Sequence, residues 1–497
     1  MSSTRTPVPA PASASEKPAR TLGLPQATAL IVGSIIGVGI FSLPGSLASF
    51  GPISIWAMVA TTVGALALAA MFASMSRRLP ADGGPYAFAR TAFGNGTGFA
   101  NAWSYWITAW AGNAAIVVGW VFYVKYVVGG WFDAQGLDTG WLGSTVPVFG
   151  QDLTLWPILF ALVGLWIPAG INLLGVRNMG VVQLWTSVIK FVPLVLMSTV
   201  GLFAISTANF SPMNLSGDTD AQAILGAMAL CLFSYLGVET VSVAAAKVRN
   251  PDVNVPRSTM FGTLATATVY LLSLVAVFGT VPSAVLGESD APYSTAADAM
   301  TGGTWAGWVV AACVIVSGIG ALNGWTMICA EMPLAAANDG LFPARFGRLS
   351  ARGVPAFGIV ASTALATLAV VVANWGSDGY TVFNTLVFMS GITAAIPYAF
   401  SALAQLKWRI TDARTVQTPR LVRDLAVSLV ALVFSVLFII YSRNTGEGNT
   451  WFQEYSPFVM AAVAFVLGIP VYLKQRSHMT QPEPVPAYPL PHTEVSS

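Results

Sequence analysis

Charged residues are scarce in this sequence. Lys, Arg, Asp and Glu make up 9% of the 497 residues, whereas a soluble domain contains about 25%. Hydrophobic residues account for 55%. A soluble protein of this length could not keep so many apolar side chains off its surface with so few charges. The composition therefore excludes a soluble multidomain protein and indicates a membrane protein.

Histidine and cysteine are also rare. The only two histidines, His478 and His492, lie in the polar C-terminal segment, so no histidine can serve a catalytic triad or a proton relay in the hydrophobic body. The three cysteines, Cys231, Cys313 and Cys329, lie in apolar segments without CxxC or metal-ligand spacing. This pattern argues against a disulfide framework or a zinc site. We expect no metal and no cofactor.

Several other function classes lack their signatures. The net charge is only +2 and no basic run follows the chain, so we expect no nucleic-acid partner. The sequence has no Walker A loop and no nucleotide-sized soluble domain, which excludes a primary pump. It also has no Gly-x-Ser-x-Gly elbow and no paired catalytic carboxylates, so we expect no enzyme activity and no catalytic residues.

Apolar segments of about 20 residues, each long enough to cross a bilayer as a helix, recur along the whole chain. Residues 1–22 and 475–497 are polar and proline-containing, and we interpret both as cytoplasmic tails, the first disordered. The sequence predicts an all-α integral membrane protein with twelve transmembrane helices, at 23–48, 53–76, 96–128, 155–175, 179–206, 222–246, 258–282, 305–336, 355–375, 379–406, 424–442 and 456–473.

Basic residues are segregated among the connections between these spans. If the N-terminus is cytoplasmic, the inner connections and the tails hold 20 of the 23 Lys and Arg residues. The outer loops hold only Arg443, while Lys125 and Lys190 fall within spans. Because cytoplasmic loops of membrane proteins carry an excess of Lys and Arg, we expect both termini to be cytoplasmic. For a prokaryotic source, we expect this multi-pass protein to lie in the inner cell membrane.

Two spans are interrupted at matching places. The first contains a glycine-rich stretch at Gly33–Phe41, and the sixth is interrupted at Phe233–Thr240. Glycine lowers the cost of unwinding a helix, and unwound backbone at membrane depth is tolerated where it lines a polar cavity. Corresponding broken helices indicate an inverted-repeat transporter with its site near the midplane. We therefore divide the chain into a first repeat, 23–206, a second repeat, 222–406, and two additional spans at 424–473.

Motifs at several separated points resemble those of the amino acid–polyamine–organocation superfamily, and within it the group of basic amino acid and polyamine antiporters that includes the arginine/agmatine antiporters. They are Gly37-x-Gly39-Ile40-Phe41, Pro80-x-x-Gly83-Gly84-Pro85-Tyr86-x-x-x-Arg90, Trp110-Ala111-Gly112-Asn113, Gly237-Val238-Glu239-Thr240, Asn250-Pro251-x-x-Asn254-Val255-Pro256, Gly324-Trp325-Thr326 and Asp339-Gly340-x-x-Pro343. The resemblance implies a LeuT-like fold, a five-plus-five inverted repeat in which helices 1 and 6 are broken. It also implies that spans 11 and 12 can form a homodimer contact.

The resemblance also implies the residues of a substrate site. The substrate carboxylate and amine are held by backbone atoms of the two breaks, around Ile35, Gly37, Gly39, Leu236 and Gly237. Trp325 stacks on the substrate, Asn113 hydrogen-bonds its distal cationic end, and Ser390 adds a hydroxyl. The implied gating residues are Tyr105, Glu239, Tyr398 and Tyr86.

Three positions depart from the arginine/agmatine pattern. Phe233 replaces a tryptophan lid, Val38 replaces a serine near the carboxylate, and Thr108 adds a hydroxyl beside Asn113. These changes weaken the case for arginine as the substrate while leaving the transporter class intact. We include Phe233 and Thr108 among the substrate-binding candidates.

Among the ionisable residues within spans, Glu239 and Lys190 lie near mid-membrane, where charges are costly and mark function. Glu239 follows the break in the sixth span, and it could attract a cationic substrate, bind a proton or hydrogen-bond the gate tyrosines. Lys190 lies mid-way along the fifth span. Three roles stay open for it: a proton carrier, a fixed cation in the place of the sodium ion of sodium-coupled relatives, or a structural ion pair. Each of the three argues against sodium dependence.

Two mechanisms follow for a secondary transporter with amino acid or polyamine substrates. The first is exchange of cationic amino acids or polyamines by alternating access, favoured by Asn113, Trp325, Ser390 and Tyr398. The alternative is proton-coupled symport of broader or neutral amino acids, favoured by Lys190 and by Phe233. The expected partners are a small-molecule substrate, protons in the second mechanism, and the lipid bilayer.

Overall fold

The structure of the protein is a computed structural model. It describes residues 22–79, 83–148, 150–175, 185–186, 188–243, 248–375, 377, 379–412, 417–444 and 450–482. Most of the two predicted tails lies outside these residues. So do Pro80 of the first loop motif and three basic residues that enter the orientation argument, Arg177, Lys247 and Arg414.

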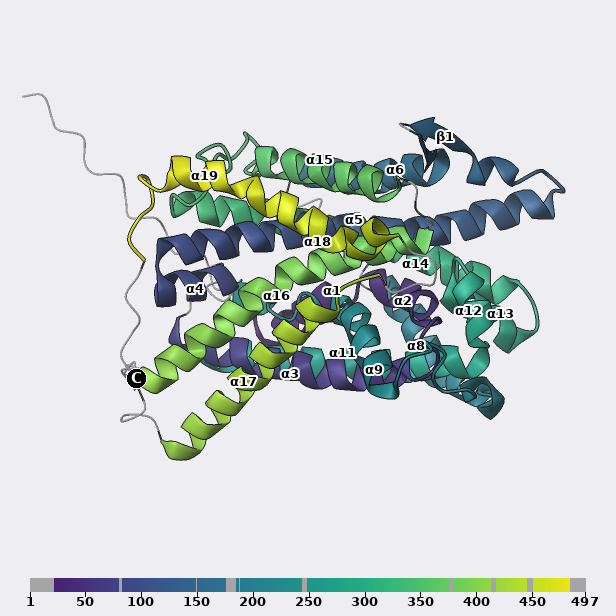
Figure 1. The fold of residues 1–497 in the computed structure, drawn as a ribbon, viewed down its shortest axis with the longest axis horizontal. Coiled ribbons are helices and arrows are strands. Elements are labelled where there is room, and N and C mark those ends of the chain that lie inside the picture. The colour runs from purple at the N-terminus through teal and green to yellow at the C-terminus, as the bar shows by residue number, and fades with distance from the viewer. Residues whose placement is uncertain are drawn as a thin grey trace, which may run out of the picture.

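Helices dominate the chain, and they run roughly along one common direction (Figure 1). The α-helices are α1 (Leu24–Ile35), α2 (Gly39–Leu47), α3 (Ser54–Arg78), α4 (Pro85–Phe93), α5 (Asn95–Ala134), α6 (Leu155–Leu173), α8 (Phe191–Thr199), α9 (Asp220–Cys231), α10 (Thr240–Val243), α11 (Pro251–Thr280), α12 (Ser283–Glu288), α13 (Pro292–Thr301), α14 (Trp305–Asn338), α15 (Ala356–Ala373), α16 (Gly379–Thr411), α17 (Thr418–Tyr441), α18 (Trp451–Val466) and α19 (Gly468–Gln475). Four short 3-10 helices are η1 (Gly140–Gly143), η2 (Val200–Ala204), η3 (Thr207–Phe210) and η4 (Leu232–Tyr235).

The described residues contain ten helical segments long and apolar enough to cross a membrane. Each coincides with a predicted span, so the expected all-helical membrane fold is confirmed. The other two predicted spans, 179–206 and 222–246, contain shorter apolar helices at Phe191–Ala204 and Asp220–Tyr235 together with residues outside the described ranges. The count of twelve therefore stays a prediction.

Burial differs strongly among the spans. In the most apolar window of α5, 94% of the residues are buried, against 33% for α17 and 28% for the segment formed by α18 and α19. Figure 1 shows α5 running along the molecule with the yellow helix α18 crossing in front of it, while α17 lies at the lower edge of the view. Helix α5 is thus a central element, and the last two spans lie at the periphery with apolar side chains facing the bilayer.

The structure confirms both helix interruptions. Helix α1 ends at Ile35 and α2 begins at Gly39, while η4 ends at Tyr235 and α10 begins at Thr240. Gly237, in the second break, has φ +105°, a conformation that side chains disfavour. A Cβ atom at Gly237 would lie 2.9 Å from the backbone carbon of Ser34. The two breaks are therefore packed directly against one another.

One element was not expected from the sequence. Strands β1 (Thr145–Val148) and β2 (Gln151–Thr154) pair as an antiparallel hairpin in the connection between the third and fourth spans. The Trp375 indole, at the end of α15, donates a hydrogen bond to the Val148 carbonyl (3.1 Å). The hairpin thereby joins two connections at the same end of the molecule.

Candidate functional site

A small cavity lies between the two helix breaks. The space between its wall atoms, including its open side, is about 320 Å³. Both broken helices contribute to its wall, together with α5 and α14. The lining residues are Ser34, Ile35, Gly37, Gly39, Ile40, Gly112, Ile116, Phe233, Ser234, Leu236 and Trp325.

Six of the predicted substrate-binding residues line this cavity: Ile35, Gly37, Gly39, Phe233, Leu236 and Trp325. Gly237 is not on the wall, because it lies behind it, against the backbone of Ser34. The residues come from positions as far apart as 35 and 325 in the chain. The fold therefore brings together most of the backbone and aromatic groups of the predicted site.

The three predicted polar side chains lie one layer behind the wall. Asn113 donates from Nδ2 to Thr326 Oγ1 (3.3 Å), and its Oδ1 is buried with no hydrogen-bond partner among the described atoms. Ser390 donates to the carbonyl of Thr108 (3.0 Å). Gly112 lines the wall in front of them, and its missing side chain leaves Ser390 Oγ only 3.2 Å from where a Cβ would stand.

The start of α2 presents free backbone donors to the cavity. This helix has no side-chain cap and no acidic residue in its first turn. The first N–H groups of a helix lack partners within it, and the helix dipole places partial positive charge at the same end. Since Gly37 and Gly39 line the cavity, this end can accept a carboxylate.

The opposite side of the first break is closed by Lys190 and Tyr270. Lys190, 1% exposed, donates from Nζ to the carbonyls of Gly33 and Ile36, both at 2.9 Å. Tyr270 of α11 donates to the carbonyl of Ile35 (3.0 Å). Within the described part of the chain, no carboxylate lies within ion-pair distance of Lys190. The lysine thus caps the carbonyl end of a broken helix.

Two aromatic rings form walls of the cavity. Trp325, 6% exposed, comes from the middle of α14. Phe233 lies against Gly39, where a Cβ would come within 2.7 Å of its ring, and meets Phe383 of α16 edge-on with centroids 6.4 Å apart. Only a glycine at position 39 leaves room for the Phe233 ring beside the start of α2.

Glu239 joins three elements below the second break. Its carboxylate is fully buried and accepts hydrogen bonds from Tyr105 of α5 (2.6 Å) and Tyr398 of α16 (2.7 Å). The Tyr398 ring also packs edge-on against Phe72 of α3, with centroids 5.5 Å apart. Three of the four predicted gate residues therefore form one hydrogen-bonded unit that ties the second break, just before α10, to α5 and α16.

Tyr86 belongs to a separate cluster. Its hydroxyl donates to Asp339 Oδ2 (3.2 Å), which also forms an ion pair with Arg90 (2.7 Å). Tyr86 and Arg90 lie on α4, whereas Asp339 follows the end of α14. The two loop motifs singled out in the sequence thus meet, at a place remote from the cavity-lining residues.

A sequence profile of the amino acid permease family matches residues 22–469 of the chain. The chain belongs to the amino acid permease family. It is similar to a cadaverine/lysine antiporter of Escherichia coli (strain K12), at 27% identity over 93% of this chain and 97% of the relative. It is also similar to an arginine/ornithine antiporter of Pseudomonas aeruginosa, at 28% identity over 94% and 93%. A putrescine transporter of Haemophilus influenzae is 30% identical over 77% and 83%. The protein is a transporter and not an enzyme.

Sequence reasoning missed several groups in this permease site. Tyr270 caps Ile35, and the small residues Ser34, Gly112 and Ser234 shape the cavity wall. Tyr270 could have been found from the sequence, because it lies in the middle of an apolar span and a buried phenol requires a hydrogen-bond partner. The small wall residues carry no comparable signal, because such residues also serve ordinary helix packing.

Gly237→Ala tests the contact between the two breaks. We expect it to lower the thermal unfolding temperature of the permease by several degrees, because the φ of +105° and the Ser34 backbone leave no room for a methyl group. Gly170→Ala is the matched control: this glycine lies inside α6 with nothing within 4 Å of its added Cβ. Equal unfolding temperatures for both variants would contradict the packing described here.

Proposed function

We propose that this permease exchanges cationic amino acids and polyamines across the membrane by alternating access. The observation that carries the proposal is the cavity between the two helix breaks, which the uncapped start of α2 and the Trp325 ring both line. An amino acid offers a carboxylate to the helix start and a cationic side chain to the indole face. The names of the antiporter relatives support the same class of substrate.

The binding mode follows from the groups on the wall. The substrate carboxylate lies against the backbone amides around Gly37 and Gly39. Its amine lies near the backbone around Leu236 and Gly237. The cationic end stacks on Trp325, a contact worth about 0.5–2 kcal/mol. Asn113 is the distal ligand, since its unpartnered Oδ1 is an acceptor that a cationic donor can satisfy. Thr108 and Ser390 hold in place the layer of side chains behind the cavity wall to which Asn113 belongs.

The gate assignments rest on hydrogen bonds between separate elements. Glu239 ties α10 to α5 and α16 through Tyr105 and Tyr398, so opening on this side requires these bonds to break or shift together. Phe233 covers the start of α2 from the other side. Tyr86 and its partner Asp339 lock α4 to the end of α14. Each of these contacts can differ between two alternating states.

Proton-coupled symport is the second candidate function. Its supporting observation is Lys190, a buried cation whose described partners are two backbone carbonyls. A buried lysine readily exchanges its proton, and its position at the end of α1 lets a change in charge act on the first break. In this mechanism the substrate range extends to neutral amino acids.

Orientation, address and assembly belong to the same proposal. The distribution of basic residues supports cytoplasmic termini, and for a prokaryotic source the proposed location is the inner cell membrane. The divisions 23–206 and 222–406 form the two repeats. The low burial of α17 and of the α18–α19 segment leaves apolar faces for a homodimer contact.

Counterflow in proteoliposomes tests exchange directly. We expect labelled arginine or lysine to enter vesicles preloaded with arginine, lysine, ornithine, cadaverine or putrescine, and not empty vesicles, in the absence of a pH gradient. Leucine inside the vesicles should not stimulate uptake. Equal uptake into empty vesicles that rises with an inward proton gradient would reject exchange in favour of symport.

Trp325→Ala tests the recognition of positive charge. Loss of a cation–π contact of about 0.5–2 kcal/mol predicts an apparent affinity for lysine or cadaverine that is about 2- to 30-fold weaker. Trp325→Phe should retain most of the affinity. Trp305→Ala is the control, because Trp305 is 66% exposed at the start of α14. An unchanged lysine affinity in Trp325→Ala would contradict the stacking arrangement.

A further inference from the structure

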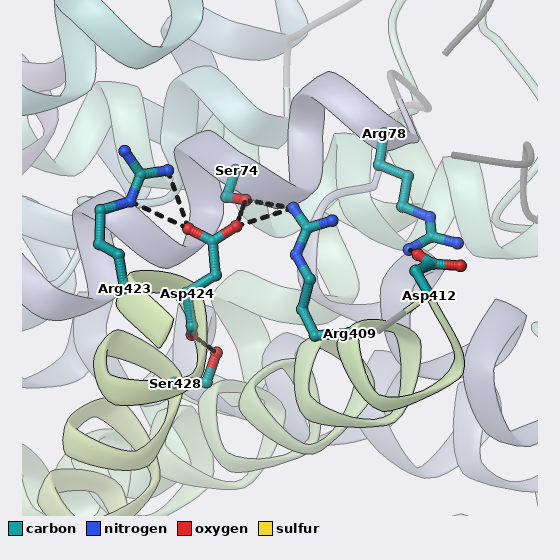
Figure 2. Close-up of polar contacts among 7 residues, drawn as sticks. All are labelled: Ser74, Arg78, Arg409, Asp412, Arg423, Asp424 and Ser428. Carbon is teal, nitrogen blue, oxygen red and sulfur yellow. Dashed lines mark hydrogen bonds and ion pairs between the residues drawn. The ribbon is translucent and has the colours of Figure 1, made fainter. Parts of the chain in front are cut away.

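A cluster of arginines and aspartates joins α3, α16 and α17 at one end of the helices (Figure 2). Asp424 of α17, 3% exposed, pairs with Arg409 (2.8 Å) and with Arg423 (2.9 Å). Ser74 of α3 also donates to this carboxylate (3.4 Å), and Arg78 forms an ion pair with Asp412 nearby. The cluster thus ties three membrane spans together. We define the arginine cluster as Arg77, Arg78, Arg409, Arg420 and Arg423.

Positive charge exceeds negative charge in this cluster. Arg77 is close enough to interact electrostatically with Arg420 and Arg423, which repel it, and with Asp252 and Asp424, which attract it. Among the described charges that these contacts connect, five arginines stand against the three carboxylates of Asp252, Asp412 and Asp424. The Nε of Arg77 is buried with no hydrogen-bond partner among the described atoms. A like-charge group of this kind calls for a further anion.

The start of α17 reinforces the need for an anion. Arg420 and Arg423 lie in the first two turns, and the first turn contains no acidic residue. Cations at a helix N-terminus oppose the helix dipole, whereas anions there are favoured. Three arginine side chains and one helix start therefore favour the same kind of ligand.

The exposed apolar surface of α17 indicates that this anion belongs to a lipid. Helix α17 is only 33% buried in its apolar window, and the Arg423 side chain is 63% exposed. Val422, Leu429 and Val433 on the same helix are 49–59% exposed, so the hydrocarbon of the bilayer covers them. A phosphate beside Arg420 and Arg423 would lie at the end of this apolar surface, in the position of a lipid headgroup.

We propose that the arginine cluster binds the phosphate of an anionic phospholipid whose acyl chains lie along α17. In the proposed orientation this lipid belongs to the cytoplasmic leaflet. Arg77, Arg420 and Arg423 contact the phosphate, while Arg409 keeps Asp424 in place behind them. The lipid then bridges α3 and α17, because Arg77 and Arg420 lie on these two helices. Basic residues next to the inner end of a membrane helix are typical of such sites.

Thermal unfolding of the full-length permease, in neutral phosphatidylcholine nanodiscs with increasing phosphatidylglycerol, measures this binding without any transport step. We expect phosphatidylglycerol to raise the unfolding temperature of the wild type. The double variant Arg420→Gln/Arg423→Gln should bind it about 30-fold more weakly, at about 1 kcal/mol for each basic residue lost near the membrane surface. Arg420→Glu alone should act in the same direction, and it leaves the ion pairs of Asp424 with Arg409 and Arg423 intact.

The control Arg345→Gln/Arg348→Gln removes the same charge from two exposed residues of the connection after α14. It should retain the wild-type response to phosphatidylglycerol. An equal response in the Arg420→Gln/Arg423→Gln variant, or an equal effect of added phosphatidylcholine, would overturn the proposal. Millimolar glycerol 3-phosphate tests whether a soluble phosphate is sufficient. If it stabilises the wild type as strongly as the lipid does, the lipid assignment is wrong. These outcomes do not depend on the transported substrate.

Discussion

Replacing Lys190 by methionine is expected to reduce exchange by at least tenfold and to lower the unfolding temperature of the permease. The methionine retains most of the apolar stem but leaves the carbonyls of Gly33 and Ile36 without their donor. A hydrogen bond from a charged group contributes about 1.5–3 kcal/mol, and a buried acceptor left without a partner is costly. The end of α1 would then lose the group that fixes its geometry beside the cavity.

Lys125→Met is the matched control for this prediction. Lys125 also lies within a span, but its ammonium pairs with Asp290 (3.0 Å) where both side chains are partly exposed. Exposed pairs of this kind contribute about 0–1 kcal/mol, so exchange should remain close to the wild type. Wild-type exchange and stability in Lys190→Met would contradict the role of Lys190 as the cap of α1.

The same variant separates the two candidate mechanisms. A lysine that only fixes the end of α1 is needed in every transport cycle, so both exchange and gradient-driven uptake should fall together. A lysine that carries a coupled proton is needed for gradient-driven uptake, and Lys190→Met would then lose that activity while retaining exchange in preloaded vesicles. Measuring both modes in one preparation distinguishes these outcomes.

The sequence predicted the features that depend on local pattern. The spans follow from the length of apolar runs, and the two breaks follow from glycines in the first span and from the Gly237–Thr240 stretch in the sixth. Lys190 and Glu239 stood out because charges inside apolar runs are costly. Their partners could not be found in the same way, because Lys190 contacts carbonyls more than 150 residues earlier and Tyr398 lies 159 residues after Glu239.

Features that depend on packing were harder to predict from the sequence. Asn113 and Ser390 are on the expected helices, but Gly112 and not Asn113 forms the cavity wall, a difference of helix rotation that spacing alone does not resolve. The hairpin of β1 and β2 is too short and polar to stand out from a loop. The arginines near Asp424 entered the sequence argument only as a topology signal, and their shared location on three helices became visible in the fold.

The largest effect after Lys190 is expected at the hydrogen-bonded unit of Glu239, Tyr105 and Tyr398. Glu239→Gln removes the charge that both phenols meet and replaces one acceptor oxygen by a donor, so one of the two phenols loses its acceptor. At about 1.5–3 kcal/mol for such a bond, we expect exchange to fall by about 10- to 150-fold. Glu454→Gln is the control, since Glu454 lies in the exposed start of α18 and pairs with Arg443 (3.2 Å); it should exchange normally.

A double-mutant cycle decides whether the three residues act as one gate. Tyr398→Phe removes the second hydrogen bond from the carboxylate, and Tyr105→Phe removes the first. If the bonds work together, Glu239→Gln/Tyr398→Phe should be less impaired than the product of the two single effects, because each change disrupts the same unit. Strictly multiplicative effects would show independent roles. If Glu239→Gln keeps full exchange and loses only the response to an imposed proton gradient, the carboxylate carries the coupled proton and the gate assignment is wrong.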